Sequence, residues 1–291
     1  MNARAIFMGV VFAFMWSSAF TSARVIVAHA PPMASLSLRF LISGVIAIAI
    51  AAALGQTPRL TRVQWRATII FGICQNALYL GLNFVAMQWV EAGLASIIAS
   101  TMPLMVALLG WLALRDRLPP LAILGLIMGF VGVALIMGGR LEGGLDWTGI
   151  ALCFVGAFAL AIATLSVRGA SSGGNVMMIV GLQMLVGSAC LAVVAGATET
   201  IEVTWSWKLF VAFVYTTLVP GILATWVWFT LVNMIGAVKA ATFHFLNPFF
   251  GVAVAWVFLG ENMGAWDVIG VFIVAAGILA VQLSKQKPTQ A

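Results

Sequence analysis

Residues 103–132 read PLMVALLGWLALRDRLPPLAILGLIMGFVG, and residues 248–277 read PFFGVAVAWVFLGENMGAWDVIGVFIVAAG. Placed 145 positions apart, the two stretches align without a gap, and several positions carry the same or a similar residue. The pairs are Pro103 with Pro248, Trp111 with Trp256, Asp116 with Glu261, Gly125 with Gly270 and Gly132 with Gly277. Self-similarity at a fixed offset indicates an internal repeat. The chain is therefore predicted to contain two copies of one unit.

The repeated stretches belong to a chain that is apolar almost throughout. Hydrophobic residues make up 63% of the 291 positions and charged residues only 8%. A helix of about 20 apolar residues crosses the roughly 30 Å hydrocarbon layer and satisfies its own backbone there. The composition predicts an all-α polytopic membrane protein with ten transmembrane helices, at residues 5–27, 33–54, 66–88, 92–114, 120–139, 148–167, 175–195, 207–230, 236–259 and 264–284.

The number of helices in each copy determines how the copies are oriented. We expect a first five-helix repeat at residues 1–144, a second at 145–285, and a short tail at 286–291. Because five is odd, the second copy enters the membrane from the opposite side and is inverted. Inverted repeats are typical of secondary transporters, with the substrate site near the midplane between them. One monomer is sufficient for both repeats, and the oligomeric state is left open.

Basic residues predict the orientation in the membrane. Ten of the 14 fall on the side of the two termini: Arg4, Arg59, Arg62, Arg66, Arg115, Arg117, Arg168, Lys239, Lys285 and Lys287. Cytoplasmic loops are enriched in Lys and Arg, so both termini are predicted to be cytoplasmic. The net charge of +6 reflects this asymmetry and contact with the lipid bilayer, and nucleic acid is not an expected partner because no cluster of basic and aromatic residues occurs.

One face of the third span collects polar side chains. Gly72, Gln75, Asn76, Tyr79 and Asn83 follow the spacing of a single α-helical face. Such a stripe either lines a cavity or forms hydrogen bonds between helices. Because three amides and a phenol exceed what helix packing needs, we favour a cavity, with Gln75, Asn76 and Tyr79 binding the substrate.

The ninth span carries a second polar group at mid-depth. His244 and Asn247 lie on one face, and the repeat places Ala99 and Met102 at the equivalent positions of the first copy. A residue needed only for folding would be expected in both copies. His244 and Asn247 are therefore predicted to contact the substrate.

Small residues in the spans suggest two further roles. Ser100 and Thr101 add polarity to the fourth span and are candidate substrate contacts, although small hydroxyls more often serve helix packing. Glycines allow helices to approach closely, and we assign helix packing to Gly125, Gly129, Gly132, Gly270 and Gly277.

Three prolines interrupt the predicted spans. Pro103, Pro220 and Pro248 each lack an amide proton and clash with the carbonyl four residues back. We expect a kink at each, and a free acceptor at the carbonyls of Ala99 and His244. Each proline is either a hinge or a static packing kink.

Tryptophan and arginine also occur where the bilayer is least polar. Trp16 lies at the centre of the first span, and with Tyr79, Trp226 and Trp228 it forms either an aromatic wall for flat or apolar side chains or simple helix packing. Arg39 lies roughly 12 Å into the second span from its outer end. A buried guanidinium needs partners, so it either clamps a substrate carboxylate, snorkels outward, or binds helix-end carbonyls.

These residues also carry a family resemblance. The chain resembles the drug/metabolite transporter superfamily, and within it the EamA-type ten-helix exporters. The resemblance rests on Met15-Trp16-Ser17-Ser18, Leu38-Arg39-Phe40, the mid-helix Pro103 and Pro248, and Leu259-Gly260-Glu261, and the chain departs from it at Leu114-Arg115-Asp116, where members often have a glutamate. Because the arginine occurs in exporters of unlike cargo, the resemblance favours a structural role for Arg39.

The resemblance implies export of small metabolites, amino acids prominent among them, across the bacterial inner membrane. Within the family the chain looks most similar to the aromatic amino-acid exporters of the YddG type. The expected function is thus a secondary transporter for aromatic or other neutral amino acids, working by alternating access. The alternative is export of drugs, nucleobases or other metabolites by proton antiport.

The energy source is constrained by what the spans contain. No Asp or Glu lies deep within a predicted span, so a carboxylate proton relay or a sodium cage is not evident. Histidine titrates near neutrality, which leaves either a facilitator or a proton antiporter that uses His244, and we slightly favour the facilitator. No nucleotide-binding signature and no Cys or His metal motif occurs, so no cofactor and no metal are expected.

Other classes of protein are less favoured. An intramembrane enzyme would need a carboxylate or thiol partner for His244, and none is recognisable from spacing, so no catalytic residues are assigned. A lipid scramblase would need a groove open to lipid.

Overall fold

The computed structural model describes residues 3–139, 146–166 and 174–284, and the regular secondary structure of these residues is helical, with no strand. Ten segments are long and apolar enough to cross a membrane: Ala3–Val27, Pro32–Ala53, Arg62–Ala86, Ala92–Ala113, Pro120–Gly139, Trp147–Leu165, Val176–Thr198, Trp207–Ile235, Lys239–Leu259 and Ala265–Ser284. Their ends lie within about five residues of the predicted ends. The predicted all-α fold with ten spans is confirmed. The predicted boundary between repeats at residues 144 and 145, and the tail 286–291, lie outside the described residues.

Six spans are single helices, and four are interrupted. The continuous helices are α1 (Ala3–Val27), α2 (Pro32–Ala53), α7 (Pro120–Gly139), α8 (Trp147–Ser166), α9 (Val176–Thr198) and α14 (Ala265–Ser284). The interrupted spans are α3 (Arg62–Phe71), η1 (Gly72–Leu80) and α4 (Gly81–Ala86); α5 (Ala92–Ser100) and α6 (Met102–Leu114); α10 (Trp207–Leu218), η3 (Val219–Leu223) and α11 (Ala224–Ile235); and α12 (Ala237–Thr242), η4 (Phe243–Leu246) and α13 (Asn247–Leu259).

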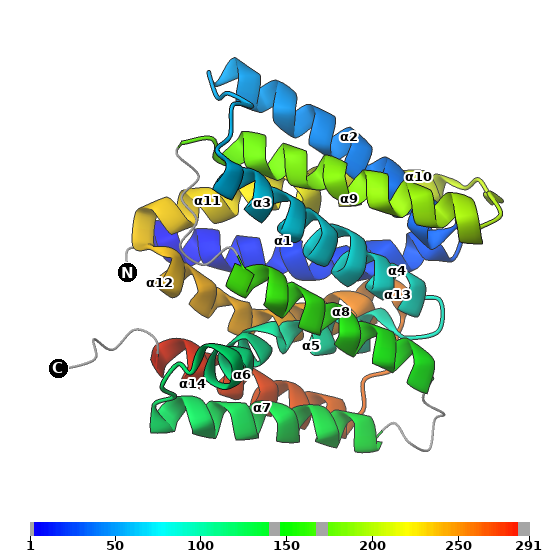
Figure 1. The fold of residues 1–291 in the computed structure, drawn as a ribbon. Coiled ribbons are helices and arrows are strands. Elements are labelled where there is room, and N and C mark those ends of the chain that lie inside the picture. The colour runs from blue at the N-terminus through cyan, green and yellow to red at the C-terminus, as the bar shows by residue number, and fades with distance from the viewer. Residues whose placement is uncertain (1–2, 140–145, 167–173, 285–291) are drawn as a thin grey trace.

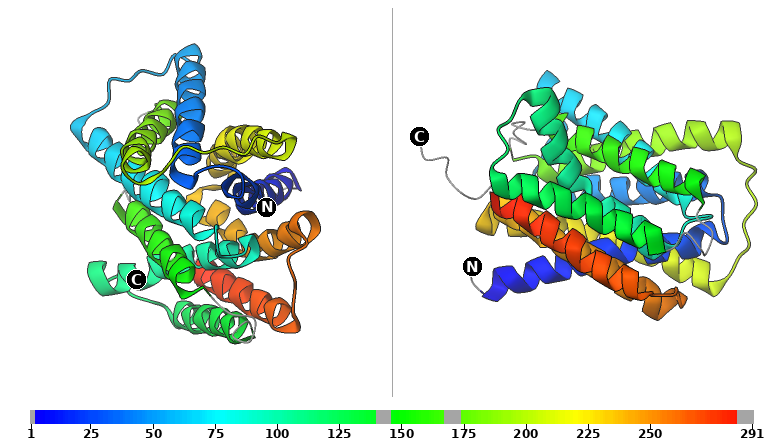
Figure 2. Two further views of the ribbon diagram at one scale, coloured as in Figure 1. Left: turned by 90° about the vertical axis from the view of Figure 1, so that its right-hand side faces the viewer. Right: turned by 90° about the horizontal axis from the view of Figure 1, so that it is seen from below.

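The helices form an elongated bundle with a tight pair at each end. Figure 1 shows α2 beside α9 at the top and α7 beside α14 at the bottom, and the end-on view in Figure 2 shows the same arrangement. Helix α1 begins and α14 ends at the same end of the bundle (Figure 1). Large apolar side chains such as Phe7, Val193 and Phe258 are exposed on the outside, as expected for a surface that faces lipid. The chain is a multi-pass membrane protein.

Glycines bring α7 and α14 close together. A Cβ atom at Gly125 would lie 2.6 Å from the carbonyl oxygen of Gly277, and one at Gly132 would lie 2.9 Å from that of Gly270. A 145-residue offset exchanges these two contacts with each other. The reciprocal pairing fits the proposed repeat, while the inverted orientation of the halves stays a prediction.

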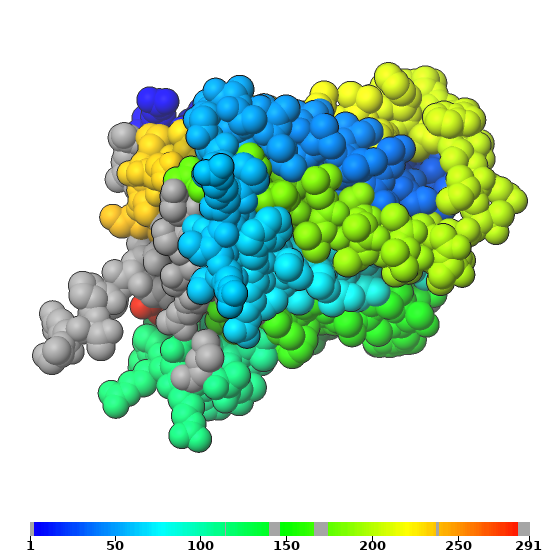
Figure 3. Space-filling view, turned by 45° about the horizontal axis from the view of Figure 1, so that its top comes forward, coloured from blue at the N-terminus to red at the C-terminus, as the bar shows by residue number. Residues whose placement is uncertain are grey.

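Helices α2 and α9 are joined through the amides that begin each helix. Glu199 accepts hydrogen bonds from the amides of Met33 (2.8 Å) and Ala34 (2.9 Å) at the start of α2. At the other end of the pair, the side chain of Gln56 accepts from the amide of Met178 (3.0 Å) at the start of α9. These bonds satisfy donors that a helix leaves unpaired in its first turn. Figure 3 shows the two helices packed along one face of the molecule.

The third and eighth spans contain π-helical turns where single α-helices were expected. Segment η1 covers nine residues, and η3, shifted by 145 positions, falls inside it. In η3 the cause is Pro220, which cannot donate to the carbonyl of Thr216. Arg39 Nε donates to that carbonyl instead (3.2 Å), and Ser43 Oγ donates to the carbonyl of Thr217 (3.2 Å).

The prolines of the fourth and ninth spans each begin a new helix segment. Pro103 is the second residue of α6 and Pro248 the second residue of α13, where a missing amide proton costs no helical hydrogen bond. The expected free carbonyl at His244 is wrong, because η4 tightens into a 3-10 turn and the amide of Asn247 donates to it. The ninth span therefore changes direction with this backbone group satisfied.

Candidate functional site

Two adjoining cavities lie in the middle of the bundle. The small cavity is lined by Trp16, Phe20, Tyr79, Ser96, Ala99, Ser100, Met102, Pro103, Leu160, His244 and Asn247. The large cavity is lined by Trp16, Ala19, Phe20, Ala23, Arg39, Phe40, Gln75, Asn76, Tyr79, Leu80, Asn83, Phe84, Met87, Met184, Pro220, Gly221 and Thr225. Trp16, Phe20 and Tyr79 belong to both linings and separate the two spaces. Both spaces are narrow: a water-sized sphere has about 20 Å³ of room in the small cavity and about 60 Å³ in the large one, so a cargo fits only if the surrounding helices move apart.

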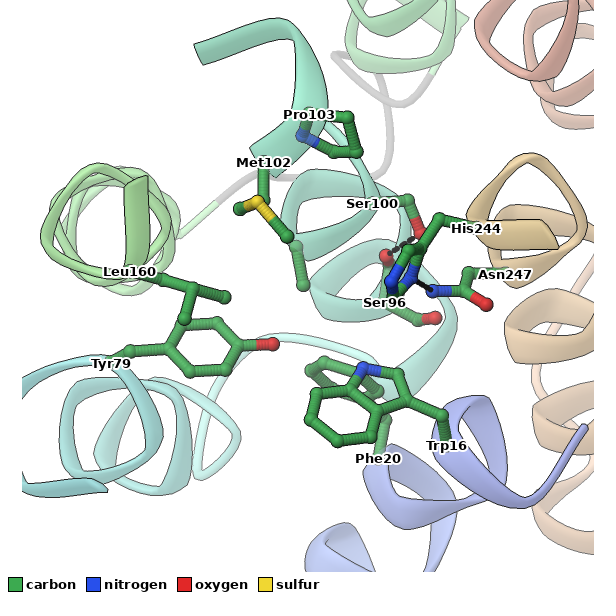
Figure 4. Close-up of a pocket in the computed structure, with 11 residues that line it drawn as sticks. Trp16, Phe20, Tyr79, Ser96, Ser100, Met102, Pro103, Leu160, His244 and Asn247 are labelled. Carbon is green, nitrogen blue, oxygen red and sulfur yellow. Dashed lines mark hydrogen bonds between the residues drawn. The ribbon is translucent and has the colours of Figure 1, made fainter. Parts of the chain in front are cut away.

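The small cavity contains a histidine and an asparagine held against each other. His244 is the second residue of η4 and lies three residues before Asn247, which opens α13. Figure 4 shows the two side chains next to each other at the small cavity. The Nδ2 atom of Asn247 lies 2.9 Å from Nδ1 of His244. An amide nitrogen can only donate, so Nδ1 accepts, and a neutral imidazole then carries its proton on Nε2.

Aromatic rings fix the histidine from behind. The ring of His244 meets Phe12 edge-on at 5.5 Å and lies 5.4 Å from Trp228. Phe12 also packs on Trp228 at 4.8 Å and on Trp16 at 5.7 Å. This packing restricts the imidazole to one orientation. Preorganised polar groups of this kind lose little entropy when a ligand binds.

Three buried polar atoms around the cavities have no hydrogen-bond partner among the described residues. Ser96 Oγ and Asn247 Oδ1 belong to residues that line the small cavity, and Asn83 Oδ1 belongs to one that lines the large cavity. Leaving a buried donor or acceptor unsatisfied costs about 1–3 kcal/mol. Such atoms are expected to bond to whatever occupies the cavities.

The aromatic wall predicted from the sequence is only partly present. Trp16 and Tyr79 line both cavities, and Figure 4 shows the Tyr79 hydroxyl and the Trp16 indole directed into the small cavity. Trp228 stands behind His244 as described above. Trp226 is 54% exposed on the outside of the bundle, so its inclusion in the wall is wrong.

Several predicted contacts also serve the packing of helices. Ser100 lines the small cavity, but its hydroxyl donates to the carbonyl of Ser96 (2.7 Å). Asn76 lines the large cavity while its Nδ2 donates to the carbonyl of Gln183 in α9 (2.9 Å). Thr101 is fully buried outside both linings and donates to the carbonyl of Ile98 (2.6 Å).

The structure brings most of the remaining predicted site residues to the same two spaces. His244, Asn247 and Pro103 line the small cavity, and Gln75, Arg39 and Pro220 line the large one. Pro248 lies outside both linings.

Sequence reasoning missed more than half of the lining residues. In the small cavity these are Phe20, Ser96, Ala99, Met102 and Leu160, and in the large cavity they are also Ala19, Ala23, Phe40, Leu80, Phe84, Met87, Met184, Gly221 and Thr225. Two of them had a usable signal. Ala99 and Met102 are the counterparts of His244 and Asn247 in the 145-residue repeat, and all four line the small cavity. If the two predicted repeats are related by an axis through the site, their counterparts converge on it, and the 145-residue offset would point to these two residues.

The chemistry of the site is that of binding. No Asp or Glu of the described chain lines either cavity, and the described ranges contain no group of three His, Cys, Asp or Glu side chains that could hold a metal. His244 therefore has no carboxylate beside it in the cavity. The arrangement offers hydrogen bonds, aromatic surfaces and one guanidinium to a small molecule.

Comparison with known proteins identifies relatives along nearly the whole chain. A model of the EamA-like transporter family matches residues 3–138 and again residues 147–283. YvbV of Bacillus subtilis (strain 168), described as an uncharacterized transporter, is 25% identical over 95% of this chain and 90% of its own length. YedA of Escherichia coli (strain K12), described as an uncharacterized inner membrane transporter, is 25% identical over the same shares.

A solved structure supports the fold. It is described as a crystal structure of protein and superposes with a TM-score of 0.70, covering 97% of this chain and 98% of that chain. At 19% sequence identity the likeness extends to the fold alone.

Proposed function

The chain belongs to the EamA-like transporter family, and from that premise we propose that it exports small metabolites, foremost amino acids with aromatic or other neutral side chains, across a bacterial inner membrane. Its family and its relatives are transporters rather than enzymes. Membership establishes transport as the activity, whereas cargo, direction, membrane and mechanism are part of the proposal.

One observation carries the proposal. The space at the middle of the bundle is lined by aromatic rings and by two residues, Ser96 and Asn247, whose Oγ and Oδ1 atoms are buried and lack a partner within the described ranges. Aromatic rings suit flat or apolar side chains, and the unpartnered oxygens suit the polar end of an amino acid. This combination supports cargo of the kind that YddG-type exporters of aromatic amino acids carry.

The place of the small cavity suggests the transport mechanism. Its walls come from α1, η1, α5, α6 and α8 and from the η4–α13 turn, hence from both predicted repeats. If the halves are inverted copies, each can adopt the conformation of the other, which opens the same site alternately to the two sides. We propose alternating access of this kind, with both termini cytoplasmic, and with the breaks at Pro103, Pro220 and Pro248 as hinges.

Counterflow in proteoliposomes tests the cargo. Liposomes loaded with unlabelled phenylalanine should accumulate labelled phenylalanine or tryptophan transiently, and an unlabelled panel of amino acids, nucleobases and drugs should define the competitors. The Thr68→Val variant is a matched control, because Thr68 is fully buried, bonds only its own helix (2.8 Å to the Gln64 carbonyl) and lines neither cavity. If only nucleobases or drugs compete, the amino-acid assignment is wrong.

A proton antiporter for other metabolites is the second candidate, favoured by the place of His244 in the small cavity. The same counterflow with the pH gradient present or collapsed separates the two. A facilitator is insensitive to the gradient. For an antiporter, the gradient should drive uphill accumulation, and His244→Ala should abolish that drive while Thr68→Val retains it.

A further inference from the structure

Arg39 is a buried charge inside the membrane. Its side chain is 5% exposed, projects from α2, and lines the large cavity. Its Nε donates to the carbonyl of Thr216, and its guanidinium lies 5.2 Å from the ring of Phe40. The structural role favoured by sequence, binding a helix carbonyl, accounts for one nitrogen of the three.

The charge itself has no counterpart. Within the described residues no carboxylate pairs with Arg39, no other hydrogen bond engages its terminal nitrogens, and no acidic side chain lines the large cavity. A charge at membrane depth is costly unless it is paired, and such a residue marks a functional pathway more often than a packing site. The guanidinium fork matches a carboxylate, which can take two parallel hydrogen bonds.

We propose that Arg39 binds the carboxylate of the cargo through its two terminal nitrogens, so that the transporter selects carboxylate-bearing solutes over amines, amides and nucleobases. The inference rests on the proposed function and narrows its substrate class. Asn83, which lines the same cavity, carries in Oδ1 a further buried acceptor without a partner in the described chain. Trp16 and Tyr79, which border both cavities, receive the side chain.

The same guanidinium also holds the break in the eighth span. Nε donates to the Thr216 carbonyl, which lacks its helical donor because residue 220 is a proline. Gly221 leaves room for the guanidinium, because a Cβ atom there would lie 3.7 Å from Nη2 and 3.3 Å from the Thr216 carbonyl oxygen. A carboxylate bound at the terminal nitrogens therefore acts on the group that stabilises η3. Arg39 connects cargo binding to the conformation of the eighth span.

The wild-type protein tests the selectivity without any mutation. Counterflow of labelled phenylalanine is competed with phenylalanine, with 3-phenylpropionate, which keeps the carboxylate, and with phenylalaninamide and phenethylamine, which lack it. Phenylalaninamide and phenethylamine cannot form the charge-assisted bidentate pair, so their inhibition constants should be about 30- to 100-fold higher than that of phenylalanine. Equal competition by phenylalaninamide would overturn the role of Arg39.

Variants locate the selectivity. In Arg39→Gln the ratio of the inhibition constants of phenylalaninamide and phenylalanine should fall toward one, whereas Arg39→Lys should retain part of it. The matched control is Ser43→Ala, which loses the neighbouring bond to the Thr217 carbonyl of the same helix break and should keep the wild-type ratio. A ratio unchanged in folded Arg39→Gln would leave Arg39 only a structural role.

The two proposals fail in different ways. Suppose that amines or nucleobases are transported with saturation, and that Asn247→Ala weakens this transport. The cavity would then remain the transport site, and the proposal that Arg39 binds a carboxylate would be overturned. Absence of counterflow for every carboxylate-bearing solute would overturn both the amino-acid cargo and the clamp.

Discussion

Replacing Asn247 with alanine tests the small cavity most directly. The substitution removes Oδ1, a buried acceptor with no partner in the described chain, and Nδ2, which donates to Nδ1 of His244 at 2.9 Å. The backbone bond from residue 247 to the His244 carbonyl does not depend on the side chain and is retained.

The size of the effect follows from the bonds lost. A hydrogen bond to a charged group contributes about 1.5–3 kcal/mol, and each 1.4 kcal/mol is a factor of ten, so losing a bond to the cargo should raise the half-saturating concentration about 10- to 150-fold. Asn247→Asp keeps an acceptor oxygen at this position but has no N–H group to donate to Nδ1 of His244. Its affinity for a cargo with an ammonium group should exceed that of Asn247→Ala.

The assay is concentration-dependent counterflow of labelled phenylalanine in proteoliposomes. Thermal unfolding in detergent, followed by size-exclusion chromatography, verifies that each variant is folded, and Thr68→Val reports the cost of losing a buried polar group elsewhere. A folded Asn247→Ala protein with wild-type half-saturation would refute the assignment of this oxygen to the cargo.

Three further substitutions address packing, helix ends and the aromatic wall. Gly277→Ala should lower the free energy of unfolding by about 1–3 kcal/mol, because a Cβ atom there would lie 2.6 Å from a carbonyl oxygen of α7. Gly138→Ala is the control, because a Cβ atom there has nothing within 4 Å, and thermal unfolding of the two variants should show a loss only for Gly277→Ala. Glu261→Ala removes an acceptor from the first amides of α5, at 2.7 and 2.8 Å, and should cost about 0.5–2 kcal/mol by chemical denaturation; an equal loss in Glu202→Ala, an exposed position, would argue against a specific cap. Tyr79→Phe should raise the half-saturating concentration about 3- to 10-fold in counterflow, since the phenol points into the small cavity (Figure 4), and unchanged kinetics would reduce Tyr79 to packing.

The spans were predictable because the bilayer imposes a length and a composition on each of them. Ten apolar runs became ten helical spans, and the interruptions at Pro103, Pro220 and Pro248 became segment boundaries or a π turn. The missing donor of proline is a local property, so the positions of the breaks in the fourth, eighth and ninth spans could be read in the sequence, whereas the π-helical segment of the third span contains no proline. The sequence does not show which group donates to the carbonyl that each proline leaves without its helical partner.

The repairs depend on distant residues. The Thr216 carbonyl is satisfied by Arg39, 177 positions away in sequence, and the His244 carbonyl by a change to 3-10 geometry. Trp226 and Trp228 are two residues apart, yet one is exposed on the outside and the other packs on His244. Which side of a helix faces inward depends on which helices are its neighbours. In η1 the π-helical turns also change the number of residues per turn, so a face read with the α-helical period is shifted.

The sequence by itself determined the fold class, the ten spans, the 145-residue repeat and most of the polar side chains that line the cavities, because each depends on hydrophobicity, spacing or identity along the chain. Only the tertiary structure decided that Thr101 is a packing residue, that Ser96 and Phe20 face the small cavity, and that Arg39 has a helix carbonyl at one nitrogen and no acid at the others. The physical reason is that an α-helix satisfies its own backbone in lipid without reference to its neighbours, whereas a side chain acquires its partners only when the helices pack.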